Sequence, residues 1–359
     1  MNRSKLPAPP AVASAGAAVH GTASIRDVAE LAGVSVGTVS NVLNRPDIVR
    51  AATVERVHAA INELGFVRND AARQLRAGRS TTIGLLVLDV RNPFFTDVAR
   101  GAEDEAASDG LSVVMANSDE SAEREASHLD YFETQRVLGM LISPIGDLGD
   151  RLERLRAAGT PVVLVDRTAG TRSLSSVAVD DVEGGRLAAQ HVLDAGRHRL
   201  AFVGGPRELE QMRDRLAGAR AAAEGVEGAS VEAIATAALG FEDGRRAARA
   251  LLSRPAGDRP DALLAGNDLV AIGALQVLMG EGGLRVPEDM AIVGYDDIDF
   301  ASAAVVPLSS IRQPRELIGQ TAVQILREEA QDPSREPRQV LFKPELVVRA
   351  STAGRGAHT

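Results

Sequence analysis

The spacing of hydrophobic residues along the chain changes near residue 80. Between residues 24 and 63 they recur every three or four positions, which is the spacing of amphipathic helices. From residue 82 onward, short aliphatic runs alternate with longer amphipathic stretches. The runs, predicted to be buried strands, cover 83–88, 111–115, 140–142, 162–165, 200–203, 262–264 and 291–293. The longer stretches, predicted to be helices, include 95–108, 186–195, 213–224 and 270–279.

This alternation predicts a doubly wound α/β body with parallel strands. A stretch of about 270 residues reaches the size at which one hydrophobic core stops growing, so two lobes are expected. Residues 1–22 are rich in Pro and Ala without apolar periodicity, which predicts a disordered N-terminal extension. A secretion signal is the alternative, because Arg3 and Lys5 precede the Ala-rich segment, but that segment lacks the hydrophobicity of a signal core.

The chain of 359 residues has a formal net charge of −9 and no cysteine. The lack of cysteine excludes a disulfide scaffold, a thiolate zinc site and a cysteine nucleophile. No apolar run approaches the roughly 20 residues that a membrane-spanning helix needs. The net charge argues against a nucleic-acid partner, but residues 1–80 hold ten Lys or Arg against six Asp or Glu, while the rest hold 30 against 43. A basic head on an acidic body indicates a separate anion-binding module.

Residues 25–44 predict two helices joined by a tight turn. Gly33 suits the left-handed conformation that ends a helix, Ser35 suits the N-cap of the next helix, and Ala29 is small where the helices must cross closely. The inward-facing positions are predicted to be Val28, Leu31 and Ala32, then Val39, Val42 and Leu43. The arrangement is typical of the DNA-reading helix-turn-helix, whose second helix would expose Val36, Gly37, Thr38, Ser40 and Asn41. Any small three-helix bundle is the alternative.

Enzymatic chemistry is not indicated. The segment from Gly33 to Gly37 fits the G-x-S-x-G pattern of serine hydrolases, but that chemistry needs a strand before the serine, and here a helix is predicted. Helix capping explains Ser35 without catalysis. The six histidines show no metal-ligand spacing, so no metal and no cofactor are expected.

Several segments, in order, resemble the lactose-repressor (LacI/GalR) family of bacterial transcription regulators over residues 24–354. The head carries IRDVAELAGVSVGTVSNVLN, and the linker NDAARQLRAGRS leads into TIGLLVLDVRNPFF. VDRTAG, GPRELEQMRDRLAG, AGNDLVAIGAL, VPEDMAIVGYDD and LSSIRQP follow. The resemblance implies a multidomain α plus α/β protein, with a helix-turn-helix head (23–68), a hinge helix or linker (69–80), a two-lobed body like periplasmic binding proteins (81–354) and a tail (355–359). Lobe 1 would cover about 81–179 plus 312–338, and lobe 2 about 180–311 plus 339–354.

The resemblance implies a repressor that binds a near-palindromic, double-stranded operator as a homodimer. Val36, Gly37 and Asn41 would face base edges, and Leu75 in the hinge would wedge between base pairs in the minor groove. Many relatives carry Arg at the position of Asn41, which leaves the base preference open. The implied DNA-binding residues are Ser24, Ser35, Val36, Gly37, Thr38, Ser40, Asn41, Asn44, Thr53, Asn69, Ala72, Leu75 and Arg76.

The resemblance also implies a cleft for a small-molecule effector, lined by Phe94, Phe95, Asp166, Arg215, Asn267 and Asp296. Aromatic faces suit a sugar ring, and Asp, Asn and Arg suit hydroxyl groups. Alternatively, Asp166 and Asp296 cap the helices after their strands, and Arg215 forms a surface ion pair. Leu209 stands where purine-binding relatives have an arginine, which favours a sugar or sugar derivative over a purine. Leu239 stands where several relatives have an aromatic lid.

The sequence also bears on the oligomeric state, the cellular location and the response to the effector. No leucine heptad follows residue 349, so a dimer rather than a tetramer is expected. The protein is expected in the cytoplasm, associated with the nucleoid and not with a membrane. The effector either induces or corepresses, since linkage allows both signs. An exported sugar-binding protein without a regulatory role is the alternative function.

Overall fold

The computed structural model describes residues 23–66, 80–171 and 173–353. The chain divides near residue 78 into two compact units, here called the head and the body. Among the described residues, no helix is long and apolar enough to cross a membrane.

The head is built from α1 (Ile25–Leu31), α2 (Val36–Asn44), a one-turn 3₁₀ helix (Pro46–Ile48) and α3 (Ala51–Leu64). Ser24 caps α1 and Ser35 caps α2, while Gly33 in the turn between them has a φ of +65°. The predicted helix, glycine turn and serine cap are therefore confirmed. The buried side chains that join the three helices are Val28, Ala29, Ala32, Val39, Val42, Val57 and Ala60.

The prediction that Leu31 faces inward is wrong, since its side chain is 46% exposed. The buried stripe of α1 runs through Val28, Ala29 and Ala32 instead. At about 100° per residue, Leu31 points well away from the middle of that stripe.

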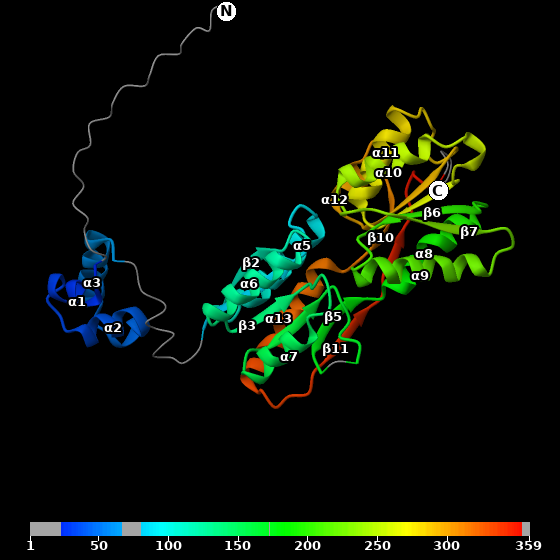
Figure 1. Ribbon diagram of the computed structural model, residues 1–359. Coiled ribbons are helices and arrows are strands. Elements are labelled where there is room, and N and C mark those ends of the chain that lie inside the picture. The colour runs from blue at the N-terminus through cyan, green and yellow to red at the C-terminus, as the bar shows by residue number, and fades with distance from the viewer. Residues whose placement is uncertain (1–22, 67–79, 172, 354–359) are drawn as a thin grey trace, which may run out of the picture. The chain divides into compact units, whose positions relative to one another are not determined.

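The first lobe of the body has a sheet in the order β11-β5-β4-β3-β1-β2, in which all pairings are parallel. The strands are β1 (Thr82–Val87), β2 (Ser112–Asn117), β3 (Gly139–Ile142), β4 (Val162–Val165), β5 (Ser175–Val179) and β11 (Gln339–Phe342). Helices α5 (Pro93–Ala107) and α13 (Arg315–Gln331) pack on one face, and α6 (Ala122–Thr134) and α7 (Gly149–Ala157) on the other (Figure 1).

The second lobe has a sheet in the order β12-β10-β9-β8-β6-β7, in which only the β10–β12 pairing is antiparallel. The strands are β6 (Arg199–Gly204), β7 (Ser230–Ala235), β8 (Ala262–Ala265), β9 (Ala291–Asp296), β10 (Ser309–Arg312) and β12 (Glu345–Val347). Helices α8 (Asp181–Asp194) and α9 (Glu210–Glu224) cover one face, and α10 (Phe241–Leu252) and α11 (Asp268–Gly280) the other (Figure 1). The short α12 (Asp299–Ala303) follows β9.

The chain passes between the lobes three times, after β5, after β10 and after β11. The predicted return to lobe 2 at residue 339 is wrong. Strand β11 pairs in parallel with β5 of lobe 1 over four residues, so the chain changes lobe only after Phe342. Val340 and Phe342 are half-buried against the lobe 1 core, which holds this edge strand there.

The helix pair α8–α9 packs with its backbones nearly touching. A Cβ atom on Gly185 would lie 1.9 Å from the carbonyl oxygen of Arg215, and one on Gly218 would lie 1.8 Å from that of Val182. Each helix therefore needs a glycine where the other crosses it. This close approach fixes the position of Arg215, which lies beside the cleft between the lobes.

Candidate functional sites

Helix α2 presents the predicted DNA-reading residues on the surface of the head. The Ser35 hydroxyl accepts a hydrogen bond from the Thr38 amide at 3.1 Å and bonds the Thr38 hydroxyl at 2.9 Å. Val36 is 39% exposed, and Gly37 and Asn41 are exposed as well. The N-terminal end of α2 is therefore both capped and accessible, as an element that enters a groove must be.

The other predicted DNA contacts of the head lie at its helix ends. Asn44, at the end of α2, donates to the Ser40 carbonyl at 2.8 Å. Thr53 lies half-buried in the first turn of α3. Ser24 gives both its backbone N–H and its hydroxyl to the Asp27 carboxylate, at 2.7 and 2.8 Å. Both hydrogen-bond donors of Ser24 are therefore already used within the head. The predicted hinge contacts Asn69, Ala72, Leu75 and Arg76 lie outside the described residues.

All six predicted effector residues line one pocket between the lobes. About 430 Å³ of space not filled by atoms lies in this pocket, part of it open to solvent. Its walls are Phe94, Phe95, Asp166, Arg215, Asn267 and Asp296, together with Leu88, Asp89, Asn92, Glu120, Leu209, Gln211, Met212 and Leu239. The two leucines noted in the sequence, Leu209 and Leu239, therefore form part of the same wall.

The pocket forms at the carboxyl ends of the parallel strands, where ligands bind in open α/β sheets. Asp166 follows β4 with a φ of +58°, and Asp296 ends β9 with a φ of +99°. Neither residue caps a helix, so the capping alternative does not apply to them. Asn267 does cap α11, accepting from the Val270 amide at 2.9 Å, and it donates to the Leu239 carbonyl at 3.0 Å.

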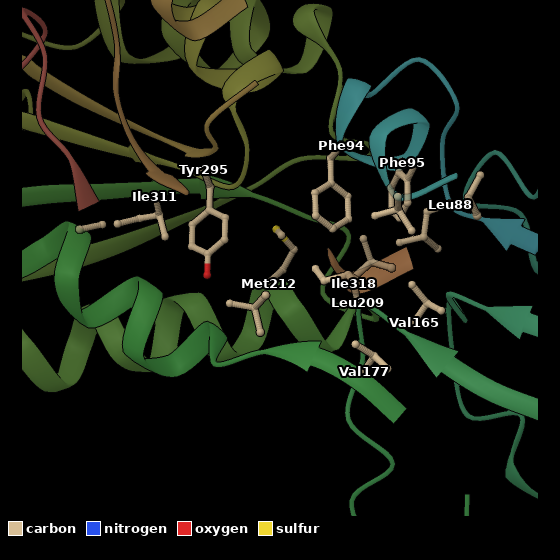
Figure 2. Close-up of a cluster of buried hydrophobic side chains, with 14 of the residues drawn as sticks. Leu88, Phe94, Phe95, Val165, Val177, Leu209, Met212, Tyr295, Ile311 and Ile318 are labelled. Carbon is tan, nitrogen blue, oxygen red and sulfur yellow. The ribbon is translucent and has the colours of Figure 1, made fainter. Parts of the chain in front are cut away.

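The apolar side of the pocket comes from both lobes. Phe94 and Phe95 begin α5, with ring centroids 5.0 Å apart in an edge-to-face arrangement. Figure 2 shows Phe94 facing Met212, which belongs to α9 of the other lobe. This cluster is continuous across the cleft, because both lobes contribute to one buried hydrophobic core. An apolar, partly aromatic surface of this kind suits the flat face of a ligand ring.

Arg215 lies in a buried ion pair, not at the surface as the alternative proposed. Its Nε is 2.8 Å from Asp181 Oδ1, with both side chains less than 10% exposed, and its Nη1 donates to the Gly266 carbonyl at 2.6 Å. The guanidinium lies 3.6 Å from the ring centre of Tyr295, whose hydroxyl donates to the same Asp181 oxygen at 2.7 Å. The positive charge is therefore neutralised within lobe 2.

Hydrogen bonds cross the cleft at two places. Asn92 of lobe 1 donates to Asp296 Oδ2 at 2.8 Å, while Gln313, from the connection after β10, donates to Asp296 Oδ1 at 2.8 Å. Gln211 of lobe 2 donates to the carbonyl and to Oδ2 of Asp166 of lobe 1, at 2.7 and 2.9 Å. These bonds hold the lobes together around the pocket.

Three oxygens of the pocket wall are buried without a partner among the described residues. They are Asp166 Oδ1, Gln211 Oε1 and Glu120 Oε2. Burial disfavours the charged carboxylates and raises the pKa of Asp166 to about 8 and that of Glu120 to about 7. At neutral pH Asp166 is protonated, so its open oxygen can donate, whereas Gln211 Oε1 accepts and Glu120 accepts when ionised. A buried polar atom is costly without a partner, so this wall suits a ligand whose groups both donate and accept, as hydroxyl groups do.

The sequence reasoning missed four polar wall residues, which are Asp89, Asn92, Glu120 and Gln211. Asn92 carried a signal, because an Asn directly before a Pro and an aromatic run is a good helix N-cap, and it does cap α5. Asp89 directly follows the aliphatic run 83–88, as Asp166 follows 162–165, so the same strand-end signal could have found it. Glu120 and Gln211 follow no local pattern. Their place depends on which loops the sheet order brings together.

The head and body each match a described family. The family "Bacterial regulatory proteins, lacI family" matches residues 24–69, and "Periplasmic binding protein-like domain" matches residues 189–352. The ribose operon repressor of Escherichia coli (strain K12) is 34% identical over 335 residues, which cover 92% of this chain and 99% of that protein. The HTH-type transcriptional repressor PurR of Aliivibrio fischeri (strain MJ11) is also 34% identical, over 93% of this chain and 99% of that protein.

The chain belongs to the LacI family of bacterial regulatory proteins. Among solved structures, the lac repressor dimer bound to operator and an anti-inducer is similar, with a TM-score of 0.78 and 29% identity over 93% of this chain and all of that chain. This LacI-family chain is thus a DNA-binding transcriptional regulator and not an enzyme. The predicted fold class, a helix-turn-helix head with a two-lobed α/β body, is confirmed.

Proposed function

We propose that this LacI-family regulator binds a near-palindromic operator as a homodimer, and that a sugar or sugar derivative in the pocket changes its affinity for the operator. One observation carries the proposal: the chain joins a capped, exposed reading helix to a pocket whose walls come from two lobes. The name of the Escherichia coli relative, a ribose operon repressor, supports a sugar effector. The description of the lac repressor neighbour as a dimer on its operator supports the assembly.

In this proposal, α2 enters the major groove and the hinge enters the minor groove. Val36, Gly37 and Asn41 face base edges, and Leu75 wedges between base pairs. The residues placed at or near phosphates or beside the wedge are Ser24, Ser35, Thr38, Ser40, Asn44, Thr53, Asn69, Ala72 and Arg76. The head would cover 23–68, the hinge 69–80 and the body 81–354, and the protein would act in the cytoplasm on the nucleoid.

Operator binding is tested by gel shift of the full chain against genomic fragments, followed by selection of the bound sequences. We expect an inverted repeat and a loss of affinity of about 10³-fold or more between 50 and 200 mM salt, because phosphate contacts release counterions. Failure to bind any fragment at low salt would contradict the proposal.

Asn41 is tested in the same selection. Asn41→Ala should relax the base preference at one position in each half-site, by about 1–3 kcal/mol of discrimination, because the amide can bind adenine with two hydrogen bonds. The control is Asn62→Ala, on the exposed surface of α3. An unchanged preference in the Asn41 variant would remove this residue from the base contacts.

The effector is tested by thermal shift against a panel of sugars, with operator titrations repeated in the presence of each hit. Stabilisation identifies the ligand, and the change in operator affinity gives the sign of the response, induction or corepression. By linkage, the operator must change ligand affinity by the same factor. A sugar that stabilises the protein without changing operator affinity would separate binding from regulation.

A further inference from the structure

Glu120 occupies a part of the pocket different from that of Asp166. It follows β2 in the loop before α6, and the carboxylates that act on it are Asp89, Asp119 and Asp243, with Arg91 as the nearby cation. Asp166 is instead surrounded by Asp181, Arg215 and Asp296. The Glu120 end therefore lies between lobe 1 and the first turn of α10, which contains Asp243.

The neighbours of Glu120 already have partners. Asp89 accepts from Arg91 Nε with both oxygens, at 2.8 and 3.0 Å. Asp243 closes the N-terminus of α10, where it accepts from the Ala238 and Gly240 amides at 3.2 and 3.3 Å. Glu120 Oε2 is buried and has no partner among the described residues.

Two further oxygens of the wall are open. Asp166 is 5% exposed and Gln211 is 4% exposed, and each keeps one oxygen without a partner in the described part of the chain. Both residues line the same pocket as Glu120. The wall thus offers one ligand two open acceptors, Glu120 Oε2 and Gln211 Oε1, and the protonated carboxyl of Asp166.

Glu120 gives its end of the wall an acceptor and, when ionised, a negative charge. The other ionisable residues of the wall are Asp89, Asp166, Asp296 and Arg215, and the arginine is already paired with Asp181. A phosphate or carboxylate placed beside Glu120 would lose its hydration and meet this acceptor instead of a donor. A hydroxyl or ammonium group placed there would meet an acceptor.

We propose that the pocket selects an effector that is rich in hydrogen-bond donors and free of phosphate and carboxylate groups, and that Glu120 determines this selection by accepting a hydroxyl or ammonium donor. The inference rests on the proposed function and narrows its ligand class. It assigns Glu120 a specificity role at the end of the pocket formed with Asp89 and the start of α10.

The test measures binding to the full chain by calorimetry at pH 7.5. The probes are D-ribose, D-glucose, cellobiose and D-glucosamine, with D-ribose 5-phosphate and D-glucose 6-phosphate as the matched anions. We expect at least one probe without phosphate to bind. The phosphorylated counterpart of that sugar should bind about 100-fold more weakly or not at all. Response to D-glucosamine but not D-glucose would assign the donor as ammonium, and the reverse as hydroxyl.

Three variants test the role of Glu120. Glu120→Gln keeps the shape and an acceptor but removes the charge, so affinity should fall about 10-fold and the discrimination against phosphate should shrink. Glu120→Arg should raise the affinity for the phosphate relative to its parent sugar. Glu123→Gln, on the exposed first turn of α6, is the matched control and should change neither value.

The outcomes separate this inference from the proposed function. Tight binding of a sugar phosphate to the unaltered chain, with a changed operator affinity, overturns the inference and leaves the proposed function standing. Binding of no probe at all overturns the sugar class together with the inference. An unchanged ratio of phosphate to sugar affinity in both Glu120 variants overturns the role of Glu120 alone.

Discussion

The reading helix of the head and the pocket of the body organise their polar groups in opposite ways. In α2, Ser35 pairs with Thr38 three positions away, and Asn44 with Ser40 four positions away, all near solvent. In the pocket, Asn92 pairs with Asp296, 204 positions away, and both are buried. The head is therefore specified by local capping chemistry, and the pocket by the topology of the two sheets.

The loss of a hydrogen-bond or ion-pair partner should therefore destabilise the two regions to different extents. A polar group that loses its partner on an exposed helix is solvated by water, so the loss is small. A charge that loses its partner in the cleft stays buried and uncompensated. Three substitutions test this contrast, beginning with the largest expected effect.

Arg215→Met should lower the free energy of unfolding of the body by about 3–5 kcal/mol, because it leaves Asp181 buried without its cation. Urea unfolding followed by circular dichroism measures the loss. Arg220→Met, on the exposed face of the same helix, is the control and should change stability by less than about 0.5 kcal/mol. A loss below about 1 kcal/mol for the Arg215 variant would contradict the view that buried Asp181 depends on this cation.

Asp166→Asn should make the body less sensitive to alkaline pH. Burial raises the pKa of Asp166 from its ordinary value of 3.8 to about 8, so the folded chain binds a proton that the unfolded chain releases. Its contribution to stability is complete below pH 4 and is lost as the pH rises through 8. The amide mimics the protonated acid, so the melting temperatures should be closest near pH 4, and the lead of the variant over the unaltered chain should grow by about 5 °C or more between pH 5 and pH 8.5.

The control for this pH series is Asp104→Asn, on the exposed surface of α5. Its melting temperature should follow that of the unaltered chain at every pH. A difference between the Asp166 variant and the unaltered chain that is the same at pH 5 and pH 8.5 would show that no proton is held at this carboxyl.

Ser35→Ala should have the smallest effect, a destabilisation of the head by about 1 kcal/mol, because α2 loses its N-cap. Operator affinity should fall with it, while the melting of the body stays unchanged. Ser108→Ala, at the end of α5 in the body, is the control and should leave operator affinity intact. A change in body melting with Ser35→Ala would mean that the two units unfold together.

The contrast between local capping in the head and long-range contacts in the body also explains which features could be predicted from the sequence. The glycine turn and serine cap of the head follow from neighbouring residues and were predictable, whereas the exposure of Leu31 depends on where the other helices cross. Continuous aliphatic runs identified β1, β2, β3, β4, β6, β8 and β9, but not the inner strands β5 and β10, each of which begins with two serines. Strands β7, β11 and β12 lie at sheet edges with half-exposed side chains, so they contain no such run.

The pocket was predictable only where a residue type at a strand end signals a ligand. Asp166 and Asp296 follow buried strands and could be identified, with the resemblance to a family as a guide. Gln211 and Glu120 lie in segments with no distinguishing pattern. Their approach to the pocket depends on lobes whose contacts join residues more than 40 positions apart.

Asp296 uses both of its carboxylate oxygens within the protein, one for Asn92 of the other lobe and one for Gln313 at the connection between lobes. Each carboxylate oxygen can accept a second hydrogen bond, so an effector can either join these amides at Asp296 or displace one of them. An effector that displaces Asn92 removes a hydrogen bond that joins the lobes, whereas one that adds its own bond leaves that link in place. The first favours separation of the lobes and the second favours closure, and the size of either response is limited by the difference in effector affinity between the two arrangements.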